Sequence, residues 1–293
     1  MHDDETRHVA PSDRIRIGVQ LSTWGPDRLG RDFTGVLDEV GQTGCQGVEI
    51  GVRYLDLAHP EALRPLLERN RLHLIACMKL MYLYDTGLLP TYVEELKQAA
   101  TFALALGADF LTIATIRKKD GRPTKEDVDT ALRVLEATGR ACHDEGIPLL
   151  YHNYATAAQT GEIERICAET DPAVMNIALD IGWFTKGGGD FFAFYQRWHE
   201  RVKYVHFKDH RGYQSAYPIG QGNVGYERVL ATLLAAGYTG WGTIELEQLP
   251  GTRESWEAMD EDITHRPYPD PLRGVSESVR WLNQTLAKLE NRS

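Results

Sequence analysis

The chain has 293 residues, a length that one α/β barrel fills without a second domain. Hydrophobic residues make up 42% of it and charged residues 25%, and no apolar run approaches the roughly eighteen residues that a membrane span needs. The formal net charge is −10 without a basic tract, which argues against nucleic acid as a partner because that affinity depends on lysine and arginine meeting phosphates.

The N-terminal segment and the cysteines indicate the compartment. Residues 1–13 are rich in charged side chains and lack an apolar stretch, which predicts a disordered tail without a secretory signal. We therefore expect a cytoplasmic protein. In that reducing compartment, cysteines without a CxxC pair are expected to be buried free thiols; they are Cys45, Cys77, Cys142 and Cys167.

From residue 14 onward, short apolar runs alternate with longer helical patterns, as is typical of parallel β-α units. Strands are predicted, in chain order, over 15–20, 47–51, 73–78, 109–114, 148–153, 176–181, 203–208 and 242–247. Helices are predicted over 33–43, 60–70, 91–106, 124–145, 160–168, 190–200, 225–236 and 274–289. Several of these helices end in a glycine, a residue that closes helices in the left-handed conformation; the glycines are Gly44, Gly107, Gly146 and Gly237.

Eight strands alternating with eight helices predict a single-domain TIM-type (β/α)₈ barrel over residues 14–293. The strands are nearly uniformly apolar, as expected where both faces of a sheet are covered. A doubly wound open sheet is the alternative, but residues 21–27 after the first strand contain no Gly-rich phosphate-binding motif. The irregular stretch near 248–272 is interpreted as an insertion in a rim loop.

Polar side chains interrupt the apolar strands close to their C-terminal ends, where a barrel places its site. A buried charge left unpaired costs several kcal/mol, whereas a divalent cation satisfies carboxylates and imidazoles on neighbouring strands together. Two imidazoles and two carboxylates suit Mn²⁺, Zn²⁺, Co²⁺ or Fe²⁺. The polar residues are Gln20, Glu49, His152, Asn153, Asp180, His206, Lys208, Glu245 and Glu247.

Each of these residues also has a purely structural interpretation. A buried histidine such as His206 usually finds a hydrogen-bond partner, Asp180 is able to cap the next element, and Glu245 is able to join a buried ion pair. Taken singly, these interpretations are at least as good as metal binding. Three acidic or imidazole residues on consecutive strands at one barrel end, however, make chance placement a poor explanation.

Five segments carry a resemblance to a known family. They read LYHNY (150–154), LDIGW (179–183), VKYVHFKDH (202–210), PIGQGNVGY (218–226) and GYTGWGTIELEQ (237–248). From the first strand to the last, the chain resembles the xylose isomerase-like superfamily of sugar phosphate isomerases and epimerases. Within it, YHNY followed by TDP (170–172), GQGNVGY and the ELEQ ending are most similar to inosose dehydratases and related keto-sugar enzymes.

The resemblance implies one metal ion held by residues of the last four strands. Asp180, His206 and Glu245 match the family's aspartate, histidine and glutamate ligands, with Glu247 as a less favoured register for the last. His152 stands where most members place a glutamate, and it is the expected fourth ligand. Mn²⁺ is the expected ion, with Co²⁺, Zn²⁺, Mg²⁺ and Fe²⁺ as alternatives.

The resemblance also implies proton abstraction next to the carbonyl of a small sugar or cyclitol. Because His152 replaces one of the paired glutamates that move the proton in many members, elimination is favoured. We expect a lyase or dehydratase acting on a keto-sugar, inosose or 3-keto-glycoside. A sugar isomerase or 3-epimerase is the close alternative, and a catalytically silent sugar-binding barrel is a third. The candidate acid and base groups are His152, Lys208 and Glu245.

Aromatic side chains on the rim are candidates for binding the substrate, since sugar sites stack such rings against C–H faces. They are Trp24, Tyr154 and Trp183, the last standing where the family often has a histidine. Simple packing is an equally good interpretation of each ring.

Charged residues near the rim have competing interpretations as well. Glu49 is expected to accept a substrate hydroxyl or to join a buried ion pair. Lys208 has a structural alternative, pairing with Asp209 or Glu247. Arg53, Arg117 and Lys118 are candidate phosphate ligands, but no backbone phosphate cradle is apparent, so an unphosphorylated substrate is expected. Packing of the 248–272 loop across a homodimer is compatible with the sequence.

Overall fold

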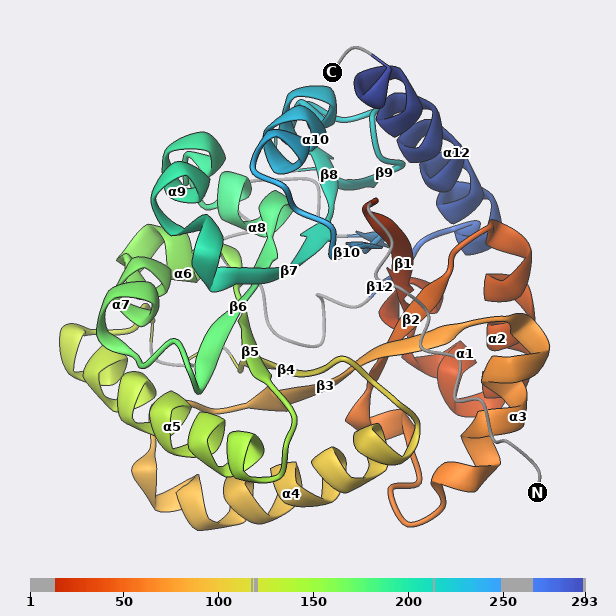
Figure 1. Cartoon of the computed structure of the whole chain (residues 1–293). Coiled ribbons are helices and arrows are strands. Elements are labelled where there is room, and N and C mark those ends of the chain that lie inside the picture. The colour runs from red at the N-terminus through yellow and green to blue at the C-terminus, as the bar shows by residue number, and fades with distance from the viewer. Residues whose placement is uncertain (1–13, 117, 119–120, 213, 249–265, 292–293) are drawn as a thin grey trace, which may run out of the picture.

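Eight parallel strands close into a barrel in the order β1-β10-β7-β6-β5-β4-β3-β2 (Figure 1). The computed structural model describes residues 14–116, 118, 121–212, 214–248 and 266–291. Closure of the sheet confirms the predicted TIM-type barrel and excludes the open-sheet alternative. The strands are β1 (Arg16–Gln20), β2 (Gly47–Gly51), β3 (His73–Met81), β4 (Phe110–Thr115), β5 (Leu149–His152), β6 (Met175–Asp180), β7 (Val202–Phe207) and β10 (Trp241–Ile244).

Helices surround the barrel on the outside (Figure 1). All eight predicted helical segments are present, and within the described residues three further short α-helices, α1, α6 and α8, follow barrel strands or the turns after them. The helices are α1 (Pro26–Arg31), α2 (Phe33–Thr43), α3 (Pro60–Asn70), α4 (Leu89–Ala105), α5 (Lys125–Asp144), α6 (Ala155–Thr160), α7 (Glu162–Glu169), α8 (Ile181–Lys186), α9 (Phe191–Trp198), α10 (Tyr226–Ala235) and α12 (Pro271–Glu290).

Local signals explain where the helices begin and end. α5 begins with a capping box, in which Thr124 and Asp127 each satisfy a backbone N–H of the other. α2 ends at Gly44, whose φ of 87° lies in the left-handed region that glycine adopts without a Cβ clash. The predicted glycine at this helix end is therefore confirmed, and it lets the chain turn directly into β2.

The barrel has two apolar layers, which explains why its strands lack polar alternation. Side chains inside the barrel form a small cluster of their own, and the larger core lies between the strands and the helices. All four cysteines are buried and unpaired, as predicted. None of the described helices combines the length and apolar character that crossing a membrane requires. The inner cluster contains Ile75, Ala76, Leu150, Ala178, Tyr204 and Trp241.

The N-terminal end of the barrel is closed by a cluster of polar and aromatic groups, here called the base cluster: Arg16, His73, Asp109 and Trp241. The Asp109 carboxylate accepts a 2.6 Å hydrogen bond from the Trp241 indole and lies 3.0 Å from His73 Nε2. His73 stacks on Trp241 with 5.5 Å between ring centroids, and the Arg16 guanidinium lies 4.0 Å from the same ring system. These contacts connect the N-terminal ends of β1, β3, β4 and β10.

The opposite, C-terminal end carries two small antiparallel sheets. β8 (Asp209–Arg211) pairs with β9 (Gln214–Tyr217), and β11 (Glu247–Gln248) pairs with β12 (Arg266–Pro267). The sequence predicted no element between the strand ending at 208 and the helix beginning at 225, so the β8–β9 hairpin is an addition to that prediction. The predicted tail at 1–13 and most of the predicted rim insertion, residues 249–265, lie outside the described residues.

Candidate metal centre and substrate pocket

Four side chains from neighbouring strands converge at the C-terminal end of the barrel. His152 and Asp180 are the last residues of β5 and β6, His206 lies in β7, and Glu245 directly follows β10. One nitrogen or oxygen atom of each lies within 4.8 Å of the corresponding atom of every other. All four are buried, and the most exposed, Glu245, shows 4% of its surface. The structure thus brings the four predicted metal ligands together.

Several polar atoms of this group have no hydrogen-bond partner among the described residues. They are both ring nitrogens of His152, Oδ2 of Asp180 and Nε2 of His206, which lies 2.9 Å from Glu49 Oε2 as an ion pair without hydrogen-bond alignment. His152 Nε2 lies 3.7 Å from Asp180 Oδ2 and 3.6 Å from Glu245 Oε2, which is too long for a hydrogen bond. Because buried polar atoms nearly always have a partner, the space between His152 Nε2, Asp180 Oδ2 and Glu245 Oε2 fits a cation. Mixed nitrogen and oxygen donors suit Mn²⁺, Co²⁺, Zn²⁺ or Fe²⁺.

Negative charge exceeds positive charge around these four residues. The carboxylates of Glu49, Asp180, Glu245 and Glu247 are buried beside one buried ammonium, that of Lys208. When both imidazoles are counted in the neutral form that binds metal, three negative charges of the cluster lack a counter-charge among these groups. Burying uncompensated charge costs several kcal/mol, so a divalent cation stabilises this arrangement.

The titration of the buried groups reflects the same imbalance. Burial raises the pKa of Asp180 above its usual value. Burial also raises the pKa of Glu245, but Lys208 and the two histidines outweigh it and hold that pKa well below its usual range. For His206, burial lowers the pKa, while the carboxylates of Glu49 and Glu245 raise it to about 10. The cluster is therefore an anionic site that attracts positive charge.

Asp180 owes its position to the junction between β6 and α8. Its Oδ1 accepts a 2.6 Å hydrogen bond from the Trp183 backbone N–H and so caps α8, as the structural interpretation of the sequence anticipated. Asn153 on the neighbouring strand end exchanges two hydrogen bonds with the Asp180 backbone, at 2.9 and 3.1 Å. With one oxygen engaged in the cap, the free Oδ2 is aimed at the cluster.

Lys208 lies behind the cluster and joins two carboxylates. Its Nζ donates to Glu245 Oε1 at 2.8 Å and to Glu247 Oε2 at 2.9 Å, and it lies 4.7 Å from the centroid of the Trp183 ring. Burial lowers the pKa of Lys208, but these carboxylates outweigh it and raise the pKa well above its usual value. Tyr226 fixes the Lys208 backbone through hydrogen bonds to its N–H and its carbonyl. The pairing with Glu247 was anticipated, whereas Asp209 instead binds backbone amides of the 220–224 loop.

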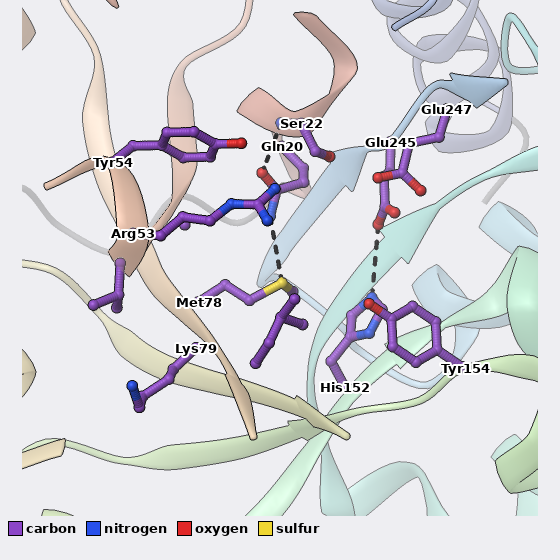
Figure 2. A pocket seen from close by; sticks show the side chains of 13 residues that line it. Gln20, Ser22, Arg53, Tyr54, Met78, Lys79, His152, Tyr154, Glu245 and Glu247 are labelled. Atoms are coloured by element: carbon purple, nitrogen blue, oxygen red, sulfur yellow. Dashed lines mark hydrogen bonds and ion pairs between the residues drawn. The ribbon is translucent and has the colours of Figure 1, made fainter. Parts of the chain in front are cut away.

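A pocket of about 210 Å³ opens beside the candidate ligands, as Figure 2 shows. His152, Tyr154 and Glu245 form one wall, and the ends of β1, β2 and β3 form the opposite one. Its lining is mostly apolar surface with a few charged and polar side chains, a combination that is common in sites for small ligands. The lining residues are Gln20, Ser22, Gly51, Val52, Arg53, Tyr54, Met78, Lys79, Leu80, His152, Tyr154, Glu245 and Glu247.

The predicted substrate-binding residues differ in their access to this pocket. Tyr154 lines it. Trp24 is 1% exposed, and its indole N–H donates to Glu39 on α2 at 2.8 Å, so its ring packs against the helix layer. Trp183 is also 1% exposed and lies edge-on to Tyr154. Glu49 is fully buried and absent from the pocket lining.

The candidate phosphate ligands are also separated by the fold. Arg53 extends into the pocket (Figure 2). Lys118 is ion-paired with Asp127 at 2.5 Å, and Arg117 lies outside the described residues. The pocket wall from Met78 to Leu80 was not predicted, because the apolar pattern placed the end of that strand at residue 78, whereas β3 continues to Met81. The one sequence signal for this wall was Lys79, a charged residue within an apolar run.

The sequence pattern of the family described as xylose isomerase-like TIM barrel matches residues 37–285. The chain belongs to that family. Among curated proteins similar to this chain, an inosose dehydratase from Lacticaseibacillus casei is 25% identical over 308 residues, covering 90% of this chain and 99% of the relative. An inosose dehydratase from Bacillus cereus is 24% identical over 280 residues, covering 83% of this chain and 93% of the relative.

Solved structures of other proteins share the fold at lower sequence identity. A D-allulose 3-epimerase from Methylomonas sp. in complex with D-allulose has a TM-score of 0.73 and 16% identity, covering 93% of this chain and 97% of that one. A 3-keto-D-glucoside 4-epimerase from E. coli in the apo form has a TM-score of 0.69 and 14% identity, covering 92% and 100%. At these identities the likeness establishes the architecture alone.

Proposed function

We propose that this protein is a divalent-metal-dependent lyase that dehydrates a keto-sugar, an inosose or a 3-keto-glycoside. The observation that carries the proposal is the buried group of His152, Asp180, His206 and Glu245 at the edge of a small pocket, in which several polar atoms have no hydrogen-bond partner among the described residues. Similarity to inosose dehydratases along 90% of the chain supports a sugar-processing enzyme and favours dehydration. Manganese is the proposed ion.

The metal centre and the chain's own residues have separate tasks in this proposal. When bound, a divalent ion supplies Lewis-acid polarisation of the substrate carbonyl. His152, Asp180, His206 and Glu245 hold it, and Tyr154 orients the sugar ring from the pocket wall. Since His152 occupies the β5 position, Glu245 is the carboxylate of this group that lines the pocket and takes the proton next to the carbonyl.

A hydrogen-bonded route connects proton removal to water release. Glu245 and Glu247 both line the pocket, and Lys208 donates to each of them. As Glu245 receives the proton from the substrate carbon, the Lys208 ammonium can pass one proton to Glu247 and regain one from Glu245. Glu247 then protonates the departing hydroxyl, which leaves as water. The substrate loses one hydrogen and one hydroxyl, and the three side chains return to their starting protonation.

Charge balance favours an uncharged substrate. A divalent ion and Lys208 offset three of the four buried carboxylates, and Arg53 at the pocket wall offsets the fourth. Lys79, the other cation that lines the pocket, is ion-paired with Glu95 at 3.0 Å. No positive charge in the described pocket is left over for a phosphate, so the proposal is an unphosphorylated polyhydroxy ketone.

The reaction is tested with a keto-inositol and manganese-loaded protein in deuterated water. We expect a product that has lost one water, detected by mass spectrometry, and no activity in Asp180→Asn. Recovery of a sugar epimer that carries solvent deuterium, without a dehydrated product, would establish epimerisation instead. Metal analysis should find one divalent ion per chain, and full activity in chelator-treated, metal-free protein contradicts the proposal.

A further inference from the structure

Glu49 reaches the candidate metal centre from the far side of the barrel. It lies in β2, whereas the four candidate ligands come from β5, β6, β7 and the end of β10. Its Oε2 lies 2.9 Å from His206 Nε2, and the other ring nitrogen, Nδ1, lies 2.9 Å from Glu245 Oε2. The two nitrogens of His206 therefore face different partners, and Glu245 Oε2 also lies 3.6 Å from His152 Nε2. Nδ1 is thus the His206 nitrogen on the side of the other candidate ligands.

A hydrogen-bond network holds the Glu49 carboxylate in this place. Thr112 of β4 donates to Oε1 at 2.5 Å, and Gln20 of β1 donates to Oε2 at 3.2 Å. The Gln20 side chain is itself fixed, because its own oxygen accepts the Ser22 backbone N–H at 3.0 Å. Glu49, Thr112 and His206 show no solvent-exposed surface. These contacts restrain the buried Glu49 carboxylate to one orientation.

We propose that Glu49 is a positioning residue for His206, which it holds with the proton on Nε2 so that Nδ1 stays free to bind metal. The inference rests on the proposed metal centre. A histidine ligand has one lone pair to give and must carry its proton on the other nitrogen. A carboxylate beside that other nitrogen fixes the tautomer, aligns the ring and makes the nitrogen that faces the metal more basic. Because Glu49 is buried behind His206, it acts through that ring rather than on the substrate.

The test compares the affinity of three variants for Mn²⁺, measured by competition with a chromophoric chelator. Losing an outer carboxylate partner lowers metal affinity by about 10- to 100-fold, and we expect that loss in Glu49→Ala. Glu49→Gln keeps an oxygen that can accept from Nε2, so its affinity should lie between those of Glu49→Ala and the wild type. Thr112→Val is the matched control, since it removes a neighbouring hydrogen bond to the same carboxylate and leaves the His206 contact.

A spectroscopic measurement on the wild type gives an independent readout. In zinc-loaded protein with ¹⁵N-labelled histidine, His206 should show a metal-bound Nδ1 and a protonated Nε2, its signals being identified by their loss in His206→Asn. The reverse tautomer overturns the inference even if Glu49→Ala does not fold. Unchanged metal affinity in folded Glu49→Ala overturns this inference alone, whereas a wild-type chain that binds no stoichiometric ion overturns the proposed metal centre with it.

Discussion

At the scale of single residues, Lys208 shows how closely charge is balanced around the pocket. Its ammonium contacts two carboxylates and an aromatic ring while showing 1% of its surface. A buried ion pair of this kind adds little net stability by itself. Removing one partner, however, lowers the free energy of unfolding strongly, because the other charge stays buried without a counter-charge. The Lys208 side chain is thus a proposed proton carrier and also the counter-charge that the fold requires for two buried carboxylates.

Lys208→Met should lower the free energy of unfolding by about 3–5 kcal/mol, since Glu245 and Glu247 would remain buried without their counter-charge. Urea unfolding of metal-free protein measures this loss, and adding Glu247→Gln should recover part of it. Lys288→Met is the control: Lys288 pairs with Glu227 at the surface, and such pairs contribute about 1 kcal/mol or less. Equal losses in both variants would show that Lys208 is not electrostatically coupled to the cluster.

The proposed preference for elimination over epimerisation rests on His152. In His152→Glu, a carboxylate again faces Glu245 across the pocket edge, so we expect metal binding to persist while dehydration slows by about tenfold or more. Solvent deuterium should then enter recovered substrate faster than in the wild type. Metal analysis and mass spectrometry of the same samples check both expectations. If neither metal content nor product changes, the identity of the β5 residue does not select the reaction.

At the scale of elements, the sequence predicted the regular parts of the barrel well, because its strand and helix periods differ clearly. The predicted helices over 33–43 and 60–70 coincide with α2 and α3. The short helix α8 was not predicted, since the apolar run of β6 continues into Ile181 without a break. The hairpin β8–β9 depends on tertiary contacts of Asp209 rather than on a local period.

The sequence predicted those parts of the candidate site whose side chains stand at the ends of barrel strands. His152, Asp180, His206 and Glu245 converge because neighbouring parallel strands end at one face of the barrel. The partners of the aromatic residues follow from tertiary packing, which a linear pattern does not encode. Trp24 donates to Glu39, fifteen positions along the chain, and Glu49 meets His206 from across the barrel.

The loop after the hairpin provides a test at this scale. Asp209 accepts the backbone N–H groups of Gly220, Gly222 and Val224, and a Cβ on Gly222 would lie 2.0 Å from its Oδ1. Gly222→Ala should therefore break these bonds and speed hydrogen exchange of the 220–224 amides by about tenfold or more, a loss of about 1–3 kcal/mol locally. Gly30→Ala in α1, where a Cβ meets no neighbour within 4 Å, should leave that exchange unchanged.

At the scale of the whole molecule, the barrel separates its chemistry from a distinct stabilising centre. The candidate ligands and the pocket lie at the C-terminal ends of the strands, whereas the base cluster lies at their N-terminal ends. Inside the barrel, the apolar side chains of Leu150, Ala178 and Tyr204 lie between the two.

The base cluster gives the molecule a defined response to acid. Burial raises the pKa of Asp109, but His73, Trp241 and Arg16 outweigh it and hold that pKa below its usual value. The stability that Asp109 contributes is thus present above the ordinary aspartate pKa of about 3.9 and is lost as the pH falls through the lower folded-state value. Asp109→Asn should destabilise the protein by about 1.5–3 kcal/mol near neutral pH, the worth of hydrogen bonds to a charged group.

The difference between wild type and Asp109→Asn should shrink as urea unfolding is repeated at pH values below about 4. Asp144→Asn, at an exposed position, is the control and should stay within about 0.5 kcal/mol of the wild type. A difference that stays constant across the acid range would assign the effect to packing rather than to the charge of Asp109.

The distance between the base cluster and the pocket has a practical consequence for redesign. Substitutions that open a rim to new substrates usually lower stability, and a chain close to its stability threshold tolerates few of them. In this protein the free energy of unfolding can be raised at the other end of the barrel, by optimising contacts around Trp241 and Asp109. These changes alter no side chain that lines the pocket. Changes at separated sites of this kind are expected to add nearly independently. A library of rim variants built on such a strengthened base should therefore contain more folded members than the same library built on the natural chain.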